Sequence, residues 1–558
     1  MGLKFPIFLA VSVAAFIMIP IGMLIVGSFS SSGLGEPLVP STLNYEKAFS
    51  DKLFFPSLTN TIIFAVGSTI LAISVAVGMA WIVVRTDTPM KRFAEFLPIF
   101  PLLLPPMMDN IAWIFLISPR AGIINRFLQD AFGLQPLFNA FSLSAMIWVF
   151  GLSQVPLAYL IIASAFTSLD PSLEESATVS GSGVIRTFFR ITVPLMVPAI
   201  LSAGILTFVA TMRSFETPTL QGIPGGVFVY VSRIYSAMQL STPPDTGLAT
   251  AYSVVLLAIT LLAVGLYLWS LKRVSKFQVI TGRGYRPRII AIGRWKYATL
   301  AFVFFYFAVA VLLPFFVVTV MSVMPYFSYS LLSENLLGSL TLRNYMRISD
   351  HPLITEGMFN SAWFGLSSAF LCVFIGFVTS YIVYRTRLRG RKFLEAIGTI
   401  PIAFPGLVIG LALLWTFFYM PGKIYGGPIA VILALIVFKL PIALRSLSGS
   451  IVQIHHELEE AARVHGGSWA YTFRRITFSL MKPALAAVSL FLFLAAFKEV
   501  GAVILLSGPG TTVAAVALFN YYGTGQWMAL SAGAVVYSIV LFAVVVAARF
   551  IFKIKLRL

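Results

Sequence analysis

The sequence predicts an all-α polytopic membrane protein with about twelve transmembrane helices, built as two parallel six-helix repeats. Three observations support this. Hydrophobic residues make up 59% of the 558 residues and charged residues only 11%, with a mean hydropathy of +0.93, whereas a soluble protein carries about 25% charged residues. Long apolar stretches recur along the chain, and polar landmarks of the first half return in the second.

The same composition excludes a disordered chain, a collagen and a coiled coil. The single cysteine, Cys372, excludes an intrachain disulfide framework and a cysteine-based zinc site. The net charge of +19 is weak support for nucleic-acid binding, because basic residues gather in the cytoplasmic loops of membrane proteins.

A helix that crosses the hydrocarbon core needs about 20 mostly apolar residues. The stretch 5–27 has no charge, is long for a signal peptide and lacks a clear cleavage site, so we expect it to be the first span. The other spans of the first half are expected at about 61–84, 96–118, 144–167, 191–212 and 247–271. Those of the second half are expected at about 297–324, 361–384, 397–420, 429–449, 480–504 and 528–548.

Lysine and arginine set the orientation. They cluster at 272–296, at 385–392 and in the C-terminal tail, which all lie on one side if the chain crosses twelve times. The positive-inside rule makes that side cytoplasmic and places both termini there. The stretch 272–296 is then a cytoplasmic linker between a first repeat, 1–271, and a second, 297–558; it could also bind anionic lipid.

Matched polar residues identify the repeat. Arg85-Thr86 returns as Arg385-Thr386, and Pro105 returns as Pro405, at an offset of 300. Later the offset falls to 285, so the first half carries 15 additional residues between about 107 and 170. The pairs at the second offset are Glu175 and Glu460, Gly181 and Gly466, Ile191 and Ile476, and Pro198 and Pro483. Parallel repeats of this kind are related by a pseudo-two-fold axis along the membrane normal, where a translocation path would lie.

A duplicated cytoplasmic loop carries the functional signal. The sequence Glu-Ser-Ala-x3-Gly follows the fourth span, and Glu-Ala-Ala-x3-Gly follows the tenth. Both resemble the EAA loop in the permease subunits of binding-protein-dependent ABC importers. The residues that carry the resemblance are Glu175, Ala177 and Gly181, and Glu460, Ala461, Ala462 and Gly466. Ser176 and Ser479 depart from the family pattern, which has alanine and proline there, so the second loop would enter its span less sharply.

Local chemistry predicts the shape of the first loop. Asp170 can cap a helix that has Pro171 at its first position. Gly181 suits a left-handed helix end. Leu173, Ala177 and Val179 are available for packing. The acidic residues Glu174 and Glu175 can face water or a partner. The loop could equally be a solvated amphipathic helix at the lipid surface.

The resemblance implies the partners. In that family each loop docks in a groove of one ATPase subunit, where the loop glutamate meets a basic residue, so Glu175 and Glu460 would be the coupling carboxylates. Two copies of a cytoplasmic ABC ATPase and an extracytoplasmic binding protein are therefore expected, in the bacterial inner membrane. The chain has no GxxxxGK[ST] phosphate loop. ATP and Mg²⁺ would bind the ATPase subunits, and we expect no cofactor, metal or catalytic site in this chain.

Ionisable residues within spans are functional candidates. Arg213 aligns with Lys498, and the two cations would face each other across the pseudo-axis. They could line the path or form a gate; alternatively, each could be neutralised by a nearby glutamate. For other polar residues, hydrogen bonding between helices is at least as good an explanation. The candidate path residues are Arg213, Glu216, Lys498, Glu499, Asp109 and Lys439.

Two outer Pro-Gly segments are candidate contacts for the binding protein, on the basis of the repeat and the resemblance. They are Pro224-Gly225 and Pro509-Gly510. The cluster of His455, His456 and His465 lies on the second cytoplasmic loop, where solvated side chains are a better explanation than a metal site.

The resemblance also suggests a cargo. The segment around Lys498-Glu499 and Pro509-Gly510 is most similar to ferric-iron permeases, and Arg213 with Lys498 would suit an anionic or ferric complex. Permeases for thiamine, phosphonate and phosphorylated metabolites share this pattern. A different class, an ion-coupled secondary transporter, would use Asp109 and Lys439 as its proton-relay candidates.

Overall fold

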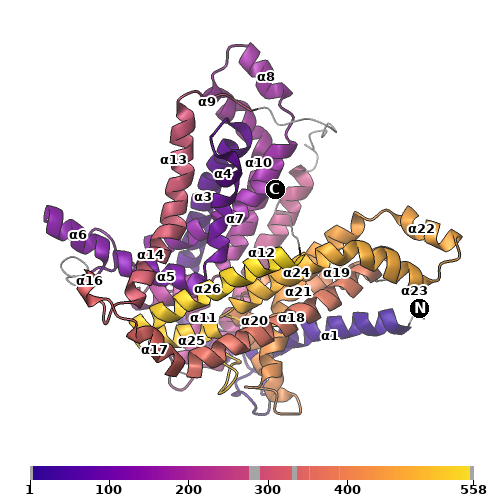
Figure 1. Ribbon diagram of the computed structural model, residues 1–558. Coiled ribbons are helices and arrows are strands. Elements are labelled where there is room, and N and C mark those ends of the chain that lie inside the picture. Colours follow the sequence, from indigo (N-terminus) through magenta and orange to yellow (C-terminus); the bar gives the residue numbers. More distant parts are fainter. Residues whose placement is uncertain are drawn as a thin grey trace. The chain divides into compact units, whose positions relative to one another are not determined.

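A computed structural model describes residues 4–274, 289–329, 336–350, 352–386, 388 and 390–552 (Figure 1). Within these ranges the chain is helical and forms no named strand. Ten helices are long and apolar enough to cross a membrane, and two bent helix pairs raise this number to twelve if each pair is one span. The all-α polytopic fold is therefore confirmed.

The chain forms two compact units, and each contains parts of both halves of the sequence. The first comprises 1–51, 233–257 and 343–556, and the second comprises 52–232 and 258–342. The helices of the first unit are α1 (Lys4–Ser28), α2 (Leu43–Ser50), α17 (Arg343–Asp350), α18 (Pro352–Arg385), α19 (Arg391–Thr399), η7 (Ile400–Ala403), α20 (Gly406–Tyr419), α21 (Pro428–Val452), α22 (His456–Val464), α23 (Trp469–Thr472), η8 (Phe473–Thr477), α24 (Phe478–Phe497), α25 (Ala514–Gly523) and α26 (Trp527–Phe552).

The helices of the second unit are α3 (Phe54–Arg85), α4 (Lys91–Phe96), η1 (Leu97–Leu103), α5 (Pro106–Ile117), α6 (Ile123–Phe132), α7 (Leu143–Ser168), α8 (Ser172–Val179), α9 (Val184–Thr187), η2 (Phe188–Thr192), α10 (Val193–Met212), η3 (Pro218–Gly222), η4 (Ile223–Gly225), α13 (Trp295–Phe307), η6 (Ala308–Leu312), α14 (Leu313–Ser322) and α16 (Leu336–Ser339). The unit boundaries divide α11 (Tyr230–Gln239) and α12 (Thr246–Val274).

Each unit is built on the same three-helix core. In the second unit α3 packs against α7 and α10, and in the first unit α18 packs against α21 and α24. Small side chains such as Ala369, Cys372 and Ala443 are buried between α18 and α21, which lets these helices approach closely. The internal repeat of the sequence is thus also a repeat of packing.

The first span of each half packs against helices of the other half. In the first unit α1 contacts α18, α19 and α20, and in the second unit α13 and α14 contact η1 and α5. The approach is close at Gly27, where a Cβ atom would lie 2.7 Å from the Trp415 ring. The repeats 1–271 and 297–558 therefore differ from the compact units. The repeat boundaries stay a prediction, and residues 275–288 of the linker lie outside the described residues.

Two of the expected spans, at 96–118 and 397–420, are bent helix pairs. The segments Lys91–Leu103 and Pro106–Ile117 meet at 92°, and Arg391–Ala403 and Gly406–Tyr419 meet at 111°. Pro105 and Pro405 stand at the two breaks with extended backbones. Proline cannot donate the backbone hydrogen bond that would continue the helix. The two bends lie at equivalent positions of the two halves, 300 residues apart.

The additional residues of the first half lie between α5 and α7. Pro106 and Gly406 keep the offset of 300, and Leu143 and Pro428 keep that of 285, so the insertion falls between these positions. It contains α6, which projects from the end of α5 (Figure 1). A cavity of about 570 Å³ lies beside it, with Trp113 and Trp148 in its lining.

Candidate functional site

The short helices α8 and α22 form an elbow at one end of each unit. Figure 1 shows α8 beyond the ends of α9 and α10, and α22 with α23 beyond the ends of α21 and α24. Gly181 and Gly466 end these helices at φ values of +81° and +79°, which confirms the expected left-handed turn. In both elbows the backbone N–H of this glycine and that of the next residue close a Schellman motif. Ser182 donates to Ala177 O at 2.9 Å, and Gly467 donates to Ala462 O at 2.8 Å.

The first elbow begins one residue later than predicted. The Asp170 carboxylate accepts a hydrogen bond from Ser172 N at 2.9 Å, but α8 starts at Ser172 and Pro171 stands just before it. Asp170 therefore stabilises the entry to the helix without occupying the N-cap position.

The exposed face of α8 differs from the prediction. Glu174, expected to face water or a partner, is buried, whereas Leu173 and Val179, expected to pack, are 50% and 89% exposed. Glu175 is exposed, as predicted. Residues four apart share one face of a helix, so Glu175 and Val179 present an acidic and an apolar group side by side.

The second elbow repeats this arrangement. Glu459 is buried, and Leu458 and Val464 are 47% and 85% exposed. Glu460 is exposed on the same side as Val464. These residues match the first elbow at the offset of 285, so both elbows carry the same outward face, an exposed glutamate with an exposed valine four residues later.

Each buried glutamate is held by two residues from outside its helix. In the second unit, Thr192 Oγ1 donates to Glu174 Oε1 at 2.7 Å, and Arg85 Nη2 lies 3.8 Å from Glu174 Oε2. Arg85 Nη2 also donates to Leu169 O at 2.9 Å. We call Arg85, Glu174 and Thr192 the first junction.

The first unit contains the matching set. Thr477 Oγ1 donates to Glu459 Oε1 at 2.7 Å, and Arg385 Nε lies 3.7 Å from the same oxygen. Arg385 Nη2 donates to Ile454 O, the counterpart of Leu169 O. We call Arg385, Glu459 and Thr477 the second junction. Sequence reasoning missed the role of both glutamates, although all three residues of each junction recur at the repeat offsets.

Each elbow enters the next span through a π-helical segment. η2 and η8 end at Thr192 and Thr477, the hydroxyl donors of the junctions. The expected difference at Ser479 is not seen, because α10 and α24 both continue directly from their π segments and both contain 20 residues. π-helical turns are rare and concentrate at functional sites.

The histidines of the second loop form no metal site. His455, His456 and His465 are exposed, and His456 Nδ1 lies 2.8 Å from Arg385 Nη1. Among the described residues no three histidine, cysteine, aspartate or glutamate side chains gather as metal ligands would.

The candidate path residues divide between the units. In the first unit Lys439 Nζ lies 2.7 Å from Glu499 Oε2, with both side chains largely buried. Glu499 is thus paired with Lys439 of α21, a residue far from it in the sequence. Arg213 and Glu216 belong to the second unit and Lys498 to the first, and the predicted opposition of Arg213 and Lys498 stays a prediction.

The second unit has polar groups of a different kind in its interior. Asp109 and Asn110 are buried in the first turn of α5, and Gln221 is fully buried in η3, which packs against α5. The Asp109 and Asn110 Oδ1 atoms, and both polar atoms of the Gln221 side chain, have no hydrogen-bond partner among the described residues. An unsatisfied buried polar group is unfavourable, so these atoms are available to water or cargo.

The Pro-Gly segments are fixed by matching asparagines. Asn360 Nδ2 donates to Gly510 O at 3.1 Å, and Asn60 Nδ2 donates to Phe228 O at 3.0 Å, shortly after Pro224-Gly225. At Gly225 a Cβ atom would lie 1.9 Å from Phe141 O, so only glycine fits. Both turns are therefore built features, and their contact with a binding protein stays a prediction.

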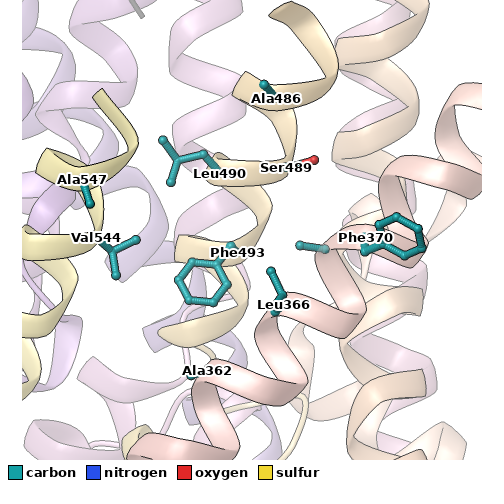
Figure 2. Close-up of a pocket in the computed structure, with 10 residues that line it drawn as sticks. Ala362, Leu366, Phe370, Ala486, Ser489, Leu490, Phe493, Val544 and Ala547 are labelled. Carbon is teal, nitrogen blue, oxygen red and sulfur yellow. The ribbon is translucent and has the colours of Figure 1, made fainter. Parts of the chain in front are cut away.

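An apolar cavity of the first unit lies apart from these polar residues. It measures about 450 Å³ and lies between α18, α24 and α26, with Leu366, Phe370, Phe493 and Val544 in its lining (Figure 2). Ser489 supplies the polar atom seen in that view, and the lining contains none of the predicted path residues. This apolar surface suits lipid chains and not a charged cargo.

Comparison with known proteins gives one family and consistent relatives. The family described as the inner membrane component of binding-protein-dependent transport systems matches residues 72–276 and 373–557. The ferric transport system permease protein FbpB of Actinobacillus pleuropneumoniae is 26% identical over 505 residues, 86% of this chain and 67% of that protein. The putative ferric transport system permease protein FbpB 1 of Haemophilus influenzae is 26% identical over 80% of this chain and 68% of its own length.

A shorter relative matches one part of the chain. The molybdenum transport system permease protein ModB of Escherichia coli is 30% identical over 200 residues, 35% of this chain and 84% of that protein. Among solved structures, a bacterial ABC transporter involved in alginate import covers 50% of this chain at 17% identity, with a TM-score of 0.41, a likeness too weak to inform on fold or function.

Proposed function

Because the chain belongs to the family of inner membrane components of binding-protein-dependent transport systems, we propose that it is a translocation subunit of an ABC importer. It supplies both permease halves in one chain and couples ATP hydrolysis on separate ATPase subunits to uptake. The observation that carries the proposal is the pair of elbows. Both end their helix at a left-handed glycine, expose a glutamate beside a valine, and bury the preceding glutamate.

The outward faces suit protein partners. Valine exposed at 89% and 85% in a polar loop is unfavourable in water and gains stability when a partner covers it. Glu175 and Glu460 beside these valines would pair with basic residues of the partner and fix its register. Two equivalent elbows require two copies of one ATPase. ATP and Mg²⁺ bind there, since this sequence lacks a phosphate-binding loop of its own.

The elbows are on the cytoplasmic side in this proposal. In each unit the elbow is joined to the basic end of a span, at Arg85 in α3 and Arg385 in α18. The positive-inside rule assigns those ends to the cytoplasm, with both termini. The opposite end carries the Pro-Gly turns, where an extracytoplasmic binding protein would deliver the cargo.

Ferric iron, or a ferric or anionic complex, is the proposed cargo. The relatives with ferric transport in their names cover 80–86% of this chain, whereas the molybdenum relative covers 35%. Candidate oxygen ligands are the unsatisfied Asp109 and Asn110 atoms of the second unit, because carboxylate and amide oxygens suit hard cations. Thiamine, phosphonate and phosphorylated metabolites are the alternatives.

The test reverses the charge of both outward faces. The double variant Glu175→Lys with Glu460→Lys should weaken attachment of the ABC ATPase by about tenfold or more, because interfacial charge pairs become repulsive, and should abolish uptake. Asp130→Lys makes the same change on exposed α6 and should alter neither. Unchanged co-purification and uptake in the double variant would refute the proposal. Uptake in proteoliposomes driven by a proton gradient alone would instead favour an ion-coupled secondary transporter.

A further inference from the structure

We propose that the two junctions are positioning contacts that transmit the movement of each elbow to two membrane spans at once. The inference rests on the proposed function, since it takes the elbows as the sites where the ATPases pull. It concerns different residues, however. The glutamates of the junctions face into the protein, on the side of each elbow helix opposite the exposed Val179 and Val464.

The connectivity is the first argument. Glu174 belongs to the elbow helix α8, Arg85 is the last residue of α3, and Thr192 is the last residue of η2, at the base of α10. One carboxylate therefore links the elbow to two spans of the core bundle. In the second junction Glu459 of α22 is linked in the same way to α18 and α24, through Arg385 and Thr477.

The arginines add a further span to each junction. Arg85 Nη2 donates to Leu169 O, directly after the end of α7. Arg385 Nη2 donates to Ile451 O at 2.8 Å, in the last turn of α21. Each junction thus gathers the ends of the three core helices of its unit around the elbow.

Burial makes each junction move as one body. The side chains of Arg85 and Glu174 are 0% and 3% exposed, and those of Arg385 and Glu459 are 1% and 5% exposed. Separating such a pair leaves a charge buried without compensation, which is strongly unfavourable. A displaced elbow therefore moves the span ends with it, because leaving them behind would strand the glutamate.

The junctions also have unused hydrogen-bonding capacity. The charged atoms lie 3.8 and 3.7 Å apart, beyond hydrogen-bond distance, and Arg85 Nε and Nη1 and Arg385 Nε have no hydrogen-bond partner among the described residues. A small inward shift of the elbow would turn each ion pair into a direct hydrogen bond. The contacts can therefore tighten and loosen during a transport cycle. The adjoining π turns provide a place where the helix can change its register.

The test removes one hydroxyl from each junction and leaves every charge in place. The double variant Thr192→Val with Thr477→Val, assembled with its ATPase and binding protein in proteoliposomes, should transport about tenfold less cargo per ATP hydrolysed, as expected when a hydrogen bond to a charged group is lost. The ATPase should still co-purify in full. The matched control, Thr192→Ser with Thr477→Ser, keeps the hydroxyls and should retain most of the coupling.

Failure of this inference is distinguishable from failure of the proposed function. If the unaltered chain does not bind an ATPase, the proposed function is wrong. If the valine variant binds the ATPase and transports normally per ATP, the junction inference is wrong. Should the double variant not assemble, the single variants Thr192→Val and Thr477→Val keep the inference open to refutation. Each single variant should lower the amount of cargo transported per ATP hydrolysed by a similar factor. A normal value in either single variant would overturn the junction inference.

Discussion

The elbow ends of the two units match each other closely, whereas their membrane interiors differ. The junctions agree in residue type, and the hydroxyl–carboxylate distance is 2.7 Å in both. In the interior, Lys439 and Glu499 form an ion pair, but the residues at the same repeat positions are Gln154 and Ser214. In the proposed function, two copies of one ATPase would present the same groove twice, while a single cargo would impose no such symmetry. The proposed function thus explains both the likeness and the difference.

Removal of the interior carboxylate tests this difference most severely. Glu499→Gln leaves Lys439 buried without its partner and should destabilise the protein by about 3–5 kcal/mol, as is typical when one member of a buried pair is lost. Thermal unfolding in detergent measures the effect. The double variant Lys439→Gln with Glu499→Ser installs the residues of the first half and should be far less unstable. If the double variant is as unstable as the single one, the ion pair is not what holds these spans together.

Substitution of the elbow glycines tests the likeness. Gly181→Ala and Gly466→Ala force a residue with a Cβ atom into the left-handed region, which costs about 1–2 kcal/mol. No neighbouring atom lies within 4 Å of either added Cβ, so backbone strain alone sets the effect. Hydrogen exchange of the two elbow helices should accelerate to the same extent. A clear inequality would show that the elbows are held differently.

The smallest effect is expected at Ser479, one of several positions at which the two loops differ. Pro194 occupies the position that Ser479 occupies in the second half, and both adjoin a π segment that leads into a helix of the same length. Ser479→Pro should therefore change the stability by less than about 0.5 kcal/mol, the usual range for a substitution without a specific mechanism. Thermal unfolding and uptake measure it. A large loss would mean that the second helix needs the backbone donor of residue 479.

Local pattern predicted the helices and elbows but not the contacts between distant residues. The apolar stretches and the glycines that end α8 and α22 could be predicted, because length and backbone freedom are properties of a few adjacent residues. The burial of Glu174 could not, since a carboxylate is exposed unless partners compensate it, and its partners lie 18 and 89 residues away, at Thr192 and Arg85. Comparison of the repeats held the missing signal, because all three residues recur.

The bent spans and the interior ion pair show the same limit. Pro105 and Pro405 indicated kinks, but the angles of 92° and 111° depend on the helices against which the two parts of each bent pair pack. The pairing of Lys439 with Glu499 joins residues 60 positions apart in the chain, whereas sequence reasoning considered only glutamates near each cation.

The packing of α1 constrains the order in which the protein can be completed. Its main packing partners are α18, α19 and α20, which follow it by hundreds of residues in the chain and are therefore synthesised later. Until these partners are synthesised, the part of α1 that they cover, including Gly27 opposite Trp415, has no helix of the first unit's core beside it. A chain stopped before α18 would therefore leave α1 without the helices that hold it in the folded protein.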